Sequence, residues 1–329
     1  MRTVLILNPT SGTSMMAEAH DTLDSHEAMI LDGLRAHGIE PEIWYTTEED
    51  AGEGLARKAA DEHADIVIAA GGDGTIHAVA SGLIGRESVL GIIAMGTMNN
   101  LAHSLGIPTT IEEACNVIAE GETHAIDVGK INGQIFLEVA GIGFEAALFP
   151  AAEEIKSSNL LKTLRGVVSG LTTLFTFQPV KLKIALDGQE RHQYHAIQVT
   201  ICNAPFYGAH FHAAPDALMD DGLLDVIIFR HFSKFAYIKH AISISQGRRE
   251  LQPRIKRCRV KSLRINADHP VEIQADGLPH GYTPATISTM PEALRVRIQN
   301  LALANNVPGL RENTQVTRKV HLQTSHPGR

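Results

Sequence analysis

Cysteine, aromatic side chains and long apolar runs are all scarce in this 329-residue chain. The three cysteines, Cys115, Cys202 and Cys258, stand far apart, so neither a disulfide framework nor a thiolate zinc site is indicated. Aromatic residues make up 5% of the chain, too few for a platform that stacks single-stranded nucleic acid. No apolar run approaches the roughly 18 residues of a membrane-spanning helix, and the apolar start is too short for a signal peptide. We therefore expect a soluble, reduced, cytosolic protein.

Acidic and basic residues are distributed unevenly along the chain. Residues 1–126 hold 5 basic and 20 acidic side chains, a net of −15, within a total net charge of −8. The remaining 203 residues hold 24 basic and 17 acidic side chains, a net of +7. Such an asymmetry, in a chain longer than most single cores, indicates two domains with different partners.

Apolar runs and helical patterns alternate through the first part of the chain. The expected strands are 3–9, 41–47, 65–70 and 89–95, and the expected helices are 16–37, 50–63 and 111–121. This alternation predicts an α/β domain with a mainly parallel, Rossmann-like sheet over residues 1–125. Ligands of such sheets bind beyond the carboxyl ends of the strands.

Hairpin signals replace the helices from about residue 126. Asn132-Gly133 and Asp187-Gly188 each separate two strand-like stretches, as in tight β-hairpins. We expect a mostly antiparallel β-sandwich as the second domain, over residues 126–288. Its other strands are expected at 223–229, 257–266 and 271–275, with a helical insertion at about 144–177 and a helix near 233–246. Residues 289–305 are expected to return to the first domain, and 306–329 to form a polar, flexible tail.

The turn after the third strand has the sequence Gly71-Gly72-Asp73-Gly74-Thr75 and runs directly into a helical pattern. Glycines let backbone N–H groups approach a phosphate closely, and a helix N-terminus adds favourable partial charge. Asp73 would repel a phosphate unless a cation such as Mg²⁺ bridged the two. The alternative is a tight strand–helix turn in which Asp73 caps the helix.

Two further turns occupy equivalent places in the pattern. Asn8-Pro9-Thr10-Ser11-Gly12 follows the first strand, and Gly96-Thr97-Met98-Asn99-Asn100 follows the fourth. Each turn alone is compatible with simple capping. Three polar, glycine-bearing turns at one edge of a sheet predict a nucleotide site.

In this order and spacing, NPTSG, GGDGT and GTMNNLAHSLGIP resemble the diacylglycerol kinase catalytic domain family, which includes bacterial lipid kinases and the sphingosine and ceramide kinases. Ile126-Asp127-Val128-Gly129 is similar to the family's Asp-hydrophobic-Gly strand, and Gln274-Ala275-Asp276-Gly277 to its late Asp-Gly-Glu motif. The resemblance covers roughly residues 1–300. The GGDG turn also occurs in NAD kinases and phosphofructokinases, whose fold the first domain would share.

The resemblance implies transfer of phosphate from ATP to a lipid hydroxyl in a cleft between the domains, with Mg²⁺. The residues implied around the nucleotide are Asn8, Thr10, Ser11, Gly12, Gly71, Gly72, Gly74, Thr75, Thr97 and Asn99. Asp73 and Asp127 would hold Mg²⁺, and the catalytic carboxylates would be Asp73 and Asp276, the latter facing the acceptor hydroxyl. A second, structural divalent cation would be held through Leu218, Asp221 and Leu223, where an ordinary Asp-Asp-Gly turn is the alternative.

Two positions depart from the family pattern. The family usually has Glu after the late Asp-Gly, where this chain has Leu278, and it often has Asp where this chain has Asn100. Both changes remove a carboxylate from the implied site. They leave open a catalytically weakened protein that binds nucleotide and lipid. A second alternative keeps the fold but is a kinase of a soluble substrate such as NAD, and the full set of motifs argues against it.

Two segments concern the lipid. Residues 156–177 are apolar with basic residues at one end, which suits either a helix beneath acyl chains or a core helix. The densest basic run comprises Arg254, Lys256, Arg257, Arg259, Lys261 and Arg264. It predicts either attraction to anionic headgroups at the inner membrane surface or a solvated sheet face. The run lacks interleaved aromatics, so no nucleic-acid partner is expected. The oligomeric state is left open, with a homodimer among the options.

Overall fold

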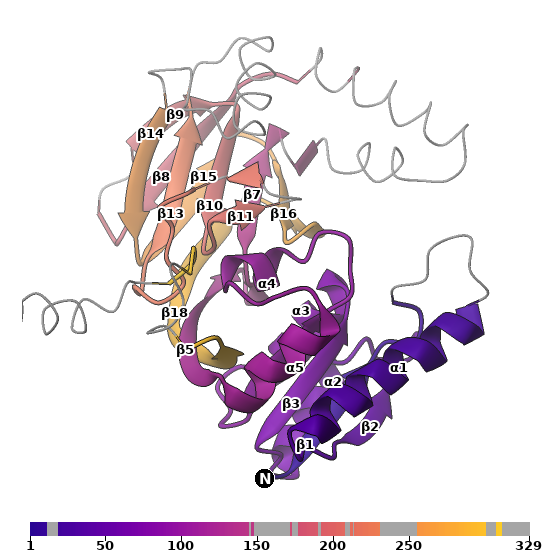
Figure 1. Ribbon diagram of the computed structural model, residues 1–329. Coiled ribbons are helices and arrows are strands. Elements are labelled where there is room, and N and C mark those ends of the chain that lie inside the picture. Colours follow the sequence, from indigo (N-terminus) through magenta and orange to yellow (C-terminus); the bar gives the residue numbers. More distant parts are fainter. Residues whose placement is uncertain are drawn as a thin grey trace, which may run out of the picture. The chain divides into compact units, whose positions relative to one another are not determined.

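The computed structural model describes residues 1–11, 19–144, 146–147, 172, 177–189, 192–207, 211–212, 214–230, 255–300 and 307–310 (Figure 1). The chain divides into two compact units. Unit 1 comprises Met1–Ile126 with Glu292–Arg329, and unit 2 comprises Asp127–Pro291. From the sequence we expected the second domain to begin at residue 126 and to end at residue 288. The expected insertion at 144–177 falls almost wholly outside the described residues, and the helix near 233–246 falls wholly outside them.

Unit 1 is built on a parallel sheet. The strand order is β2 (Glu42–Tyr45), β1 (Thr3–Leu7), β3 (Ile66–Gly71) and β4 (Val89–Ala94). The last part of β18 (Ala285–Ile298) runs parallel to β4, with Val296 opposite Leu90. Every residue of β1 and β3 is buried, which explains why both segments are continuously apolar in sequence.

Helices cover both faces of this sheet (Figure 1). The helices are α1 (Ala19–Ala36), α2 (Glu53–Asp61), α3 (Asp73–Leu83), α4 (Asn100–Ser104) and α5 (Ile111–Glu120). On one face α1 and α5 share a core with the alternate side chains of β1 and β3, including Leu5 and Ile68. On the other face α2 packs against α3, close enough that Gly82 touches Ala56. The expected α/β architecture of the first domain is confirmed.

Unit 2 is a sandwich of two antiparallel sheets. One sheet has the order β14 (Ile255–Val260), β13 (Leu224–Phe229), β10 (Gln198–Cys202), β7 (Val139–Gly143), β16 (Glu272–Ala275) and β17 (Leu278–Tyr282). The other contains the first part of β18, β15 (Ser262–Ala267), β8 (Val180–Leu186) and β9 (His192–Ala196). β5 (Glu122–Ile131) pairs with β18, and β6 (Gln134–Phe136) pairs with β5. A short ribbon joins β11 (Phe206–Tyr207) and β12 (Phe211–His212). Side chains from both sheets, among them Phe136, Ile142 and Ile184, form one core.

Both hairpin signals correspond to hairpins in the structure. Asn132 (φ 49°) and Gly133 (φ 93°) join β5 to β6, and Asp187 (φ 46°) and Gly188 (φ 74°) lie in the turn between β8 and β9. These positive φ values are the reason that Asn-Gly and Asp-Gly occupy the turns.

The expected single strand at 257–266 is wrong. The chain turns at Lys261, so that β14 and β15 lie in different sheets. The buried residues Val260 and Leu263 are three positions apart, which breaks the two-residue period of one strand. The basic run therefore does not form one row of charges.

The beginning of the expected flexible tail is also wrong. Val307 and Leu310 are buried in unit 1, and the Gly309 N–H donates to Ser104 O at 2.8 Å. Residues 311–329 lie outside the described residues.

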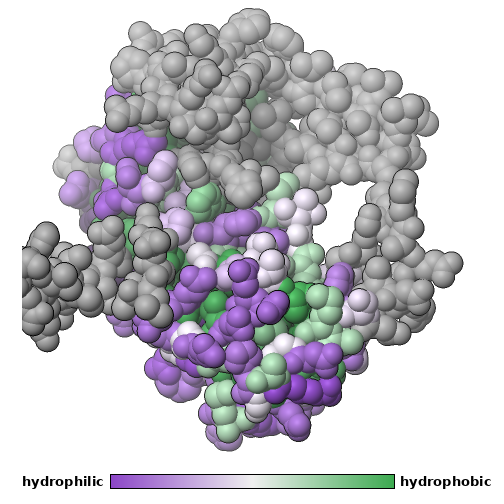
Figure 2. All heavy atoms as spheres, viewed as in Figure 1, coloured by the Kyte–Doolittle hydropathy of each residue, from purple (hydrophilic) through white to green (hydrophobic). Residues whose placement is uncertain are grey.

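The described surface is that of an ordinary globular protein. Figure 2 shows hydrophilic and hydrophobic side chains interspersed on the coloured part of the face in view. Among the described residues, no helix combines the length and apolarity needed to cross a bilayer.

Candidate active site

The three polar turns of unit 1 meet where β1, β3 and β4 end. The amide of Asn8, after β1, donates from Nδ2 to Thr75 Oγ1 at 2.9 Å. The carboxylate of Asp73, after β3, accepts the backbone N–H groups of Asn99 at 3.0 Å and Asn100 at 2.8 Å. Side chains of the first and second turns thus fix the second and third turns.

Each flanking turn is also stabilised internally. Asn8 Oδ1 accepts the backbone N–H and the hydroxyl of Thr10, at 3.0 and 2.9 Å, and the Ser11 N–H donates to Asn8 O. Asn99 has a left-handed backbone (φ 50°), and its side-chain amide pairs with both the N–H and the carbonyl of Gly96. Thr97 is exposed between them. Gly12 lies outside the described residues.

Glycine is required where the second and third turns touch. A Cβ on Gly96 would lie 2.9 Å from the Cα of Gly72, and a Cβ on Gly71 would lie 2.7 Å from Thr75 Cβ. Gly74 is different, because it is exposed and a Cβ there would meet nothing within 4 Å. The packing therefore explains Gly71 and Gly96 but not Gly74.

The first turn of α3 is open to an anion. Gly72 precedes the helix in an extended conformation (φ −83°), no side chain in the described part of the chain caps it, and the first helical bond runs from Ile76 N–H to Gly72 O. The first N–H groups of a helix have no partner inside the helix and carry partial positive charge. Exposed Gly74 leaves room for a phosphate to approach them.

Asp73 and Asn100 present oxygen atoms suited to Mg²⁺. Each carboxylate oxygen of Asp73 accepts one backbone N–H, which leaves further lone pairs on both oxygens. Asn100 Oδ1 is buried without a hydrogen-bond partner among the described residues. Carboxylate and amide oxygens are hard ligands, so these residues fit a magnesium ion, although the described residues contain no cluster of three His, Cys, Asp or Glu around a common point.

Asp127 anchors a loop of unit 2. Its side chain is fully buried, its N–H donates to Met219 O, and its Oδ2 accepts the N–H of Gly222, both at 2.6 Å. Asn203, also fully buried, donates from Nδ2 to Asp127 O at 2.9 Å and to Leu137 O at 2.8 Å. The loop at 219–222 is thereby fixed to the start of the β-sandwich.

Asp276 anchors the chain that leads into β7. Its backbone is left-handed (φ 46°), its Oδ1 accepts the N–H groups of Glu138 and Val139 at 3.0 and 2.9 Å, and its Oδ2 accepts that of Leu137 at 2.5 Å. Three N–H groups thus donate to this one carboxylate. Its two oxygens hold backbone in place, and the catalytic role implied by the resemblance stays a prediction. Leu278, two residues further on, is 51% exposed.

The loop implied for a second cation lies beside the guanidinium of Arg259 on β14. Asp221 Oδ1 accepts the Leu223 N–H at 2.9 Å, and its Oδ2 lies 3.8 Å from the guanidinium of Arg259. Arg259 also donates to Asp216 O at 2.8 Å and pairs with Asp225 at 3.3 Å. A divalent cation on Asp221 would be repelled by this guanidinium, so the residues present do not fit one. Burial raises the pKa of Asp225, an effect that Arg259 partly offsets.

Sequence reasoning missed two residues that organise unit 2, Glu138 and Asn203, and it gave Arg259 of the basic run no contact with residues 216–225. Glu138 is 6% exposed, and its carbonyl accepts the N–H groups of Asn203 and Ala204. Neither Glu138 nor Asn203 belongs to a recognisable motif. A polar residue directly after an apolar strand, as Asn203 follows β10, was the only available signal.

Among the implied residues, the structure brings together Asn8, Asp73, Thr75 and Asn99 in unit 1. In unit 2 it brings Asp127 beside the 219–222 loop and links it through Asn203 to the segment that Asp276 holds.

Two family models match the chain. The model of the diacylglycerol kinase catalytic domain matches residues 2–131, and that of the YegS C-terminal NAD kinase beta sandwich-like domain matches residues 138–298. Among curated proteins, the diacylglycerol kinase of Bacillus subtilis (strain 168) is 29% identical over 288 residues, which is 86% of this chain and 91% of the relative. The diacylglycerol kinase of Staphylococcus aureus (strain JH9) is 29% identical over 314 residues, 93% and 96% of the two chains.

Solved structures show the same likeness. A diacylglycerol kinase from Bacillus anthracis superposes with a TM-score of 0.71 at 25% identity, covering 92% of this chain and 98% of that one. An NAD kinase from Archaeoglobus fulgidus shares the fold alone, with a TM-score of 0.50 at 14% identity over 98% and 99% of the two chains. With both of its units matched by family models, the chain belongs to the diacylglycerol kinase catalytic domain family of lipid kinases.

Proposed function

We propose that this protein transfers the γ-phosphoryl group of ATP to the hydroxyl of a lipid such as a diacylglycerol, in an interdomain cleft, with Mg²⁺. The curated relatives in Bacillus subtilis and Staphylococcus aureus carry the name diacylglycerol kinase. In this proposal the enzyme acts in the cytoplasm and meets its substrate at the inner membrane surface.

The observation that carries the proposal is the open first turn of α3 inside the set of three linked turns. Packing does not require a glycine at position 74, whereas a phosphate that approaches the helix N-terminus does. The N–H groups of Asp73, Gly74 and Thr75 would bind the phosphates. The polar groups of Asn8, Thr10, Ser11, Thr97 and Asn99 would surround the rest of the nucleotide.

Phosphoryl transfer depends mainly on positioning and on neutralising charge. When bound, Mg²⁺ would neutralise negative charge that develops on the transferred phosphoryl group. Asp73 and Asn100 would hold it in unit 1, where Asp73 also keeps the 96–100 turn in place. Asp127 would contribute to its surroundings from unit 2. Asp276 would act by fixing residues 137–139 and by its negative charge near the acceptor hydroxyl.

A second candidate is a protein that binds nucleotide and lipid but transfers phosphate slowly or not at all. The position that usually carries Glu in the family is the exposed Leu278, and the nearby Asp276 carboxylate already accepts three N–H groups. A general base contributes roughly 10²- to 10⁴-fold to rate, so its absence would leave a slow enzyme.

The experiment is transfer of ³²P from labelled ATP to a panel of acceptors: diacylglycerol, ceramide and sphingosine in mixed micelles, and NAD in solution. We expect metal-dependent labelling of a lipid and none of NAD. Asp73→Ala should abolish the labelling, while Asp61→Ala, which removes an exposed carboxylate at the end of α2, should preserve it. Equal labelling by wild type and Asp73→Ala would refute the site, and metal-dependent ATP binding without transfer to any acceptor would favour the second candidate.

A further inference from the structure

The outer face of the β9–β8–β15–β18 sheet carries a group of three cationic side chains. Lys181 and Lys183 on β8 and Arg264 on β15 are exposed and alternate with buried core residues, so all three point away from the sandwich. The other outward positions of these strands include Gln193, His195, Ala185 and Asn266. Among the described residues, no outward position of β8, β9, β15 or the part of β18 that pairs with β15, Ala285–Ser288, holds a carboxylate.

The strand register places the three cations close together. Ala185 is opposite Arg264, and Lys183, two residues before it, is opposite Asn266. Lys183 and Arg264 are therefore diagonal neighbours, roughly 7–8 Å apart. Lys181 follows at about 7 Å along the same strand. None of the three forms an ion pair or hydrogen bond with a described residue, so their charge is available to a partner.

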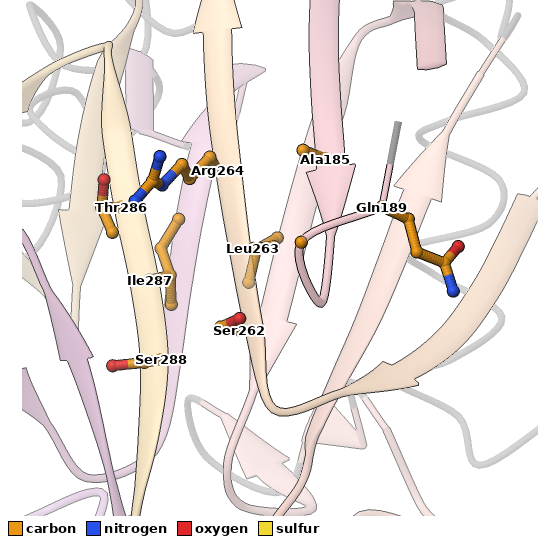
Figure 3. A pocket seen from close by; sticks show the side chains of 9 residues that line it. Ala185, Gln189, Ser262, Leu263, Arg264, Thr286, Ile287 and Ser288 are labelled. Atoms are coloured by element: carbon orange, nitrogen blue, oxygen red, sulfur yellow. The ribbon is translucent and has the colours of Figure 1, made fainter. Parts of the chain in front are cut away.

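A recess of about 440 Å³ lies beside Arg264 on this face. Figure 3 shows the Arg264 side chain reaching from β15 toward Thr286 on β18, with Ser262 and Ser288 along the same two strands. The pairs Arg264–Thr286 and Ser262–Ser288 are directly opposite in the register. A guanidinium flanked by three hydroxyl groups suits the oxygens of a phosphate group.

The chemistry of the face selects among partners. The outward positions described on β8, β9 and β15 include no large apolar side chain, which the core of a stable protein interface requires. They include no Phe, Tyr or Trp on which nucleic-acid bases could stack. What remains is a cationic, hydroxyl-bearing surface, which matches a layer of anionic phospholipid headgroups.

We propose that this face docks the protein on an anionic membrane through Lys181, Lys183 and Arg264, with the phosphate of one phospholipid in the recess. Of the basic run at residues 254–264, for which attraction to anionic headgroups was one expectation, only Arg264 lies on this face. The inference rests on the proposed function in one respect: a lipid kinase has to reach its substrate in a membrane. Binding to vesicles itself requires neither ATP nor phosphoryl transfer.

The test is sedimentation of the full chain with vesicles of phosphatidylcholine containing phosphatidylglycerol, without ATP. The triple variant Lys181→Gln/Lys183→Gln/Arg264→Gln should bind roughly 100-fold more weakly, because each cation near an anionic surface contributes a factor of about five. Wild-type binding should weaken with salt and be absent on pure phosphatidylcholine.

The matched control removes three exposed cations elsewhere, as Arg35→Gln/Arg57→Gln/Arg257→Gln, and should bind like wild type. Equal loss in both triples would show that only net charge matters and would overturn the proposal, as would undiminished vesicle binding by the first triple. Loss of self-association in the first triple, with vesicle binding unchanged, would assign the face to a second copy of the chain. The first triple should phosphorylate a short-chain, soluble diacylglycerol at the wild-type rate, so a failure of the kinase proposal is recorded separately from a failure of docking.

Discussion

At the scale of single residues, the acidic side chains of the family motifs hold loops in place. Asp73 binds the turn before α4, Asp127 binds the 219–222 loop, and Asp276 binds residues 137–139, in each case through backbone N–H groups. A carboxylate is well suited to this role, because hydrogen bonds to a charged acceptor are stronger than those between neutral groups. Removing such a side chain therefore affects both the shape of the site and its charge.

Asp276→Asn separates these two effects in unit 2. The amide keeps the shape of the side chain and tolerates a left-handed backbone, but its NH₂ group opposes one of the three N–H donors. We expect the free energy of unfolding to fall by about 2 kcal/mol, measured by urea denaturation followed by circular dichroism. An unchanged stability would contradict the role given to Asp276 in holding residues 137–139.

Leu278→Glu tests the missing carboxylate. Because Leu278 is 51% exposed, a charged side chain can be placed there without desolvation, and stability should be unaffected. If the site lacks a base, the turnover number for lipid should rise roughly 100-fold in the labelled-ATP assay. The control is Leu278→Gln, because glutamine has the size of glutamate without its charge. This variant should keep the wild-type turnover number. A rise in both variants would point to shape rather than to base catalysis.

At the scale of elements, the sequence revealed those whose residues repeat a local pattern. The parallel strands are continuously apolar because both faces are covered, and the two hairpins carry the Asn-Gly and Asp-Gly pairs that their positive φ values require. β14 and β15 were merged because neither charge nor hydropathy marks the turn at Lys261. Asn203 and Glu138 were missed because their partners are distant in the chain, 76 residues away for Asn203 and Asp127.

The β3–α3 turn contains two glycines whose replacement should have opposite effects on stability. Gly71→Ala would drive a Cβ to 2.7 Å from Thr75 Cβ and Oγ1, and we expect a loss of about 1–3 kcal/mol. Gly74→Ala meets no atom within 4 Å and lies in the first turn of α3, so we expect a gain of up to about 1 kcal/mol. Thermal denaturation of the two variants measures both effects. A destabilised Gly74→Ala would mean that packing, and not a ligand, selects glycine there.

At the scale of the whole molecule, the chain passes between the two units twice, after Ile126 and after Pro291. Unit 1 is therefore completed by residues that follow unit 2 in sequence. Leu294, Val296 and Ile298 are fully buried, and Val296 pairs with Leu90 of β4. From the sequence we expected residues 289–305 to rejoin the first domain, but not that they would form a strand beside β4. That partner strand lies some 200 residues earlier in the chain, so no local pattern indicates the pairing.

A chain ending at residue 291 should consequently lose the folded state of unit 1. Burial of each of the three apolar side chains contributes roughly 1.5–3 kcal/mol, and their sum is comparable to the stability of a typical domain. A chain ending at residue 310, which keeps buried Val307 and Leu310, should unfold like the full chain. Unfolding of both truncated chains can be followed by the fluorescence of Trp44 in β2. Equal unfolding midpoints for the two chains would disprove that unit 1 depends on residues 292–310.

The central claim is that the open first turn of α3 binds the phosphates of ATP. Its most direct test is calorimetric titration of ATP with Mg²⁺ into wild type and Gly74→Ala, because this variant is expected to fold at least as well as wild type. The added methyl group occupies the space that a phosphate would use, so we predict binding at least about tenfold weaker, the equivalent of one charge-assisted hydrogen bond. Equal affinity in the two proteins would place the nucleotide elsewhere and contradict the claim.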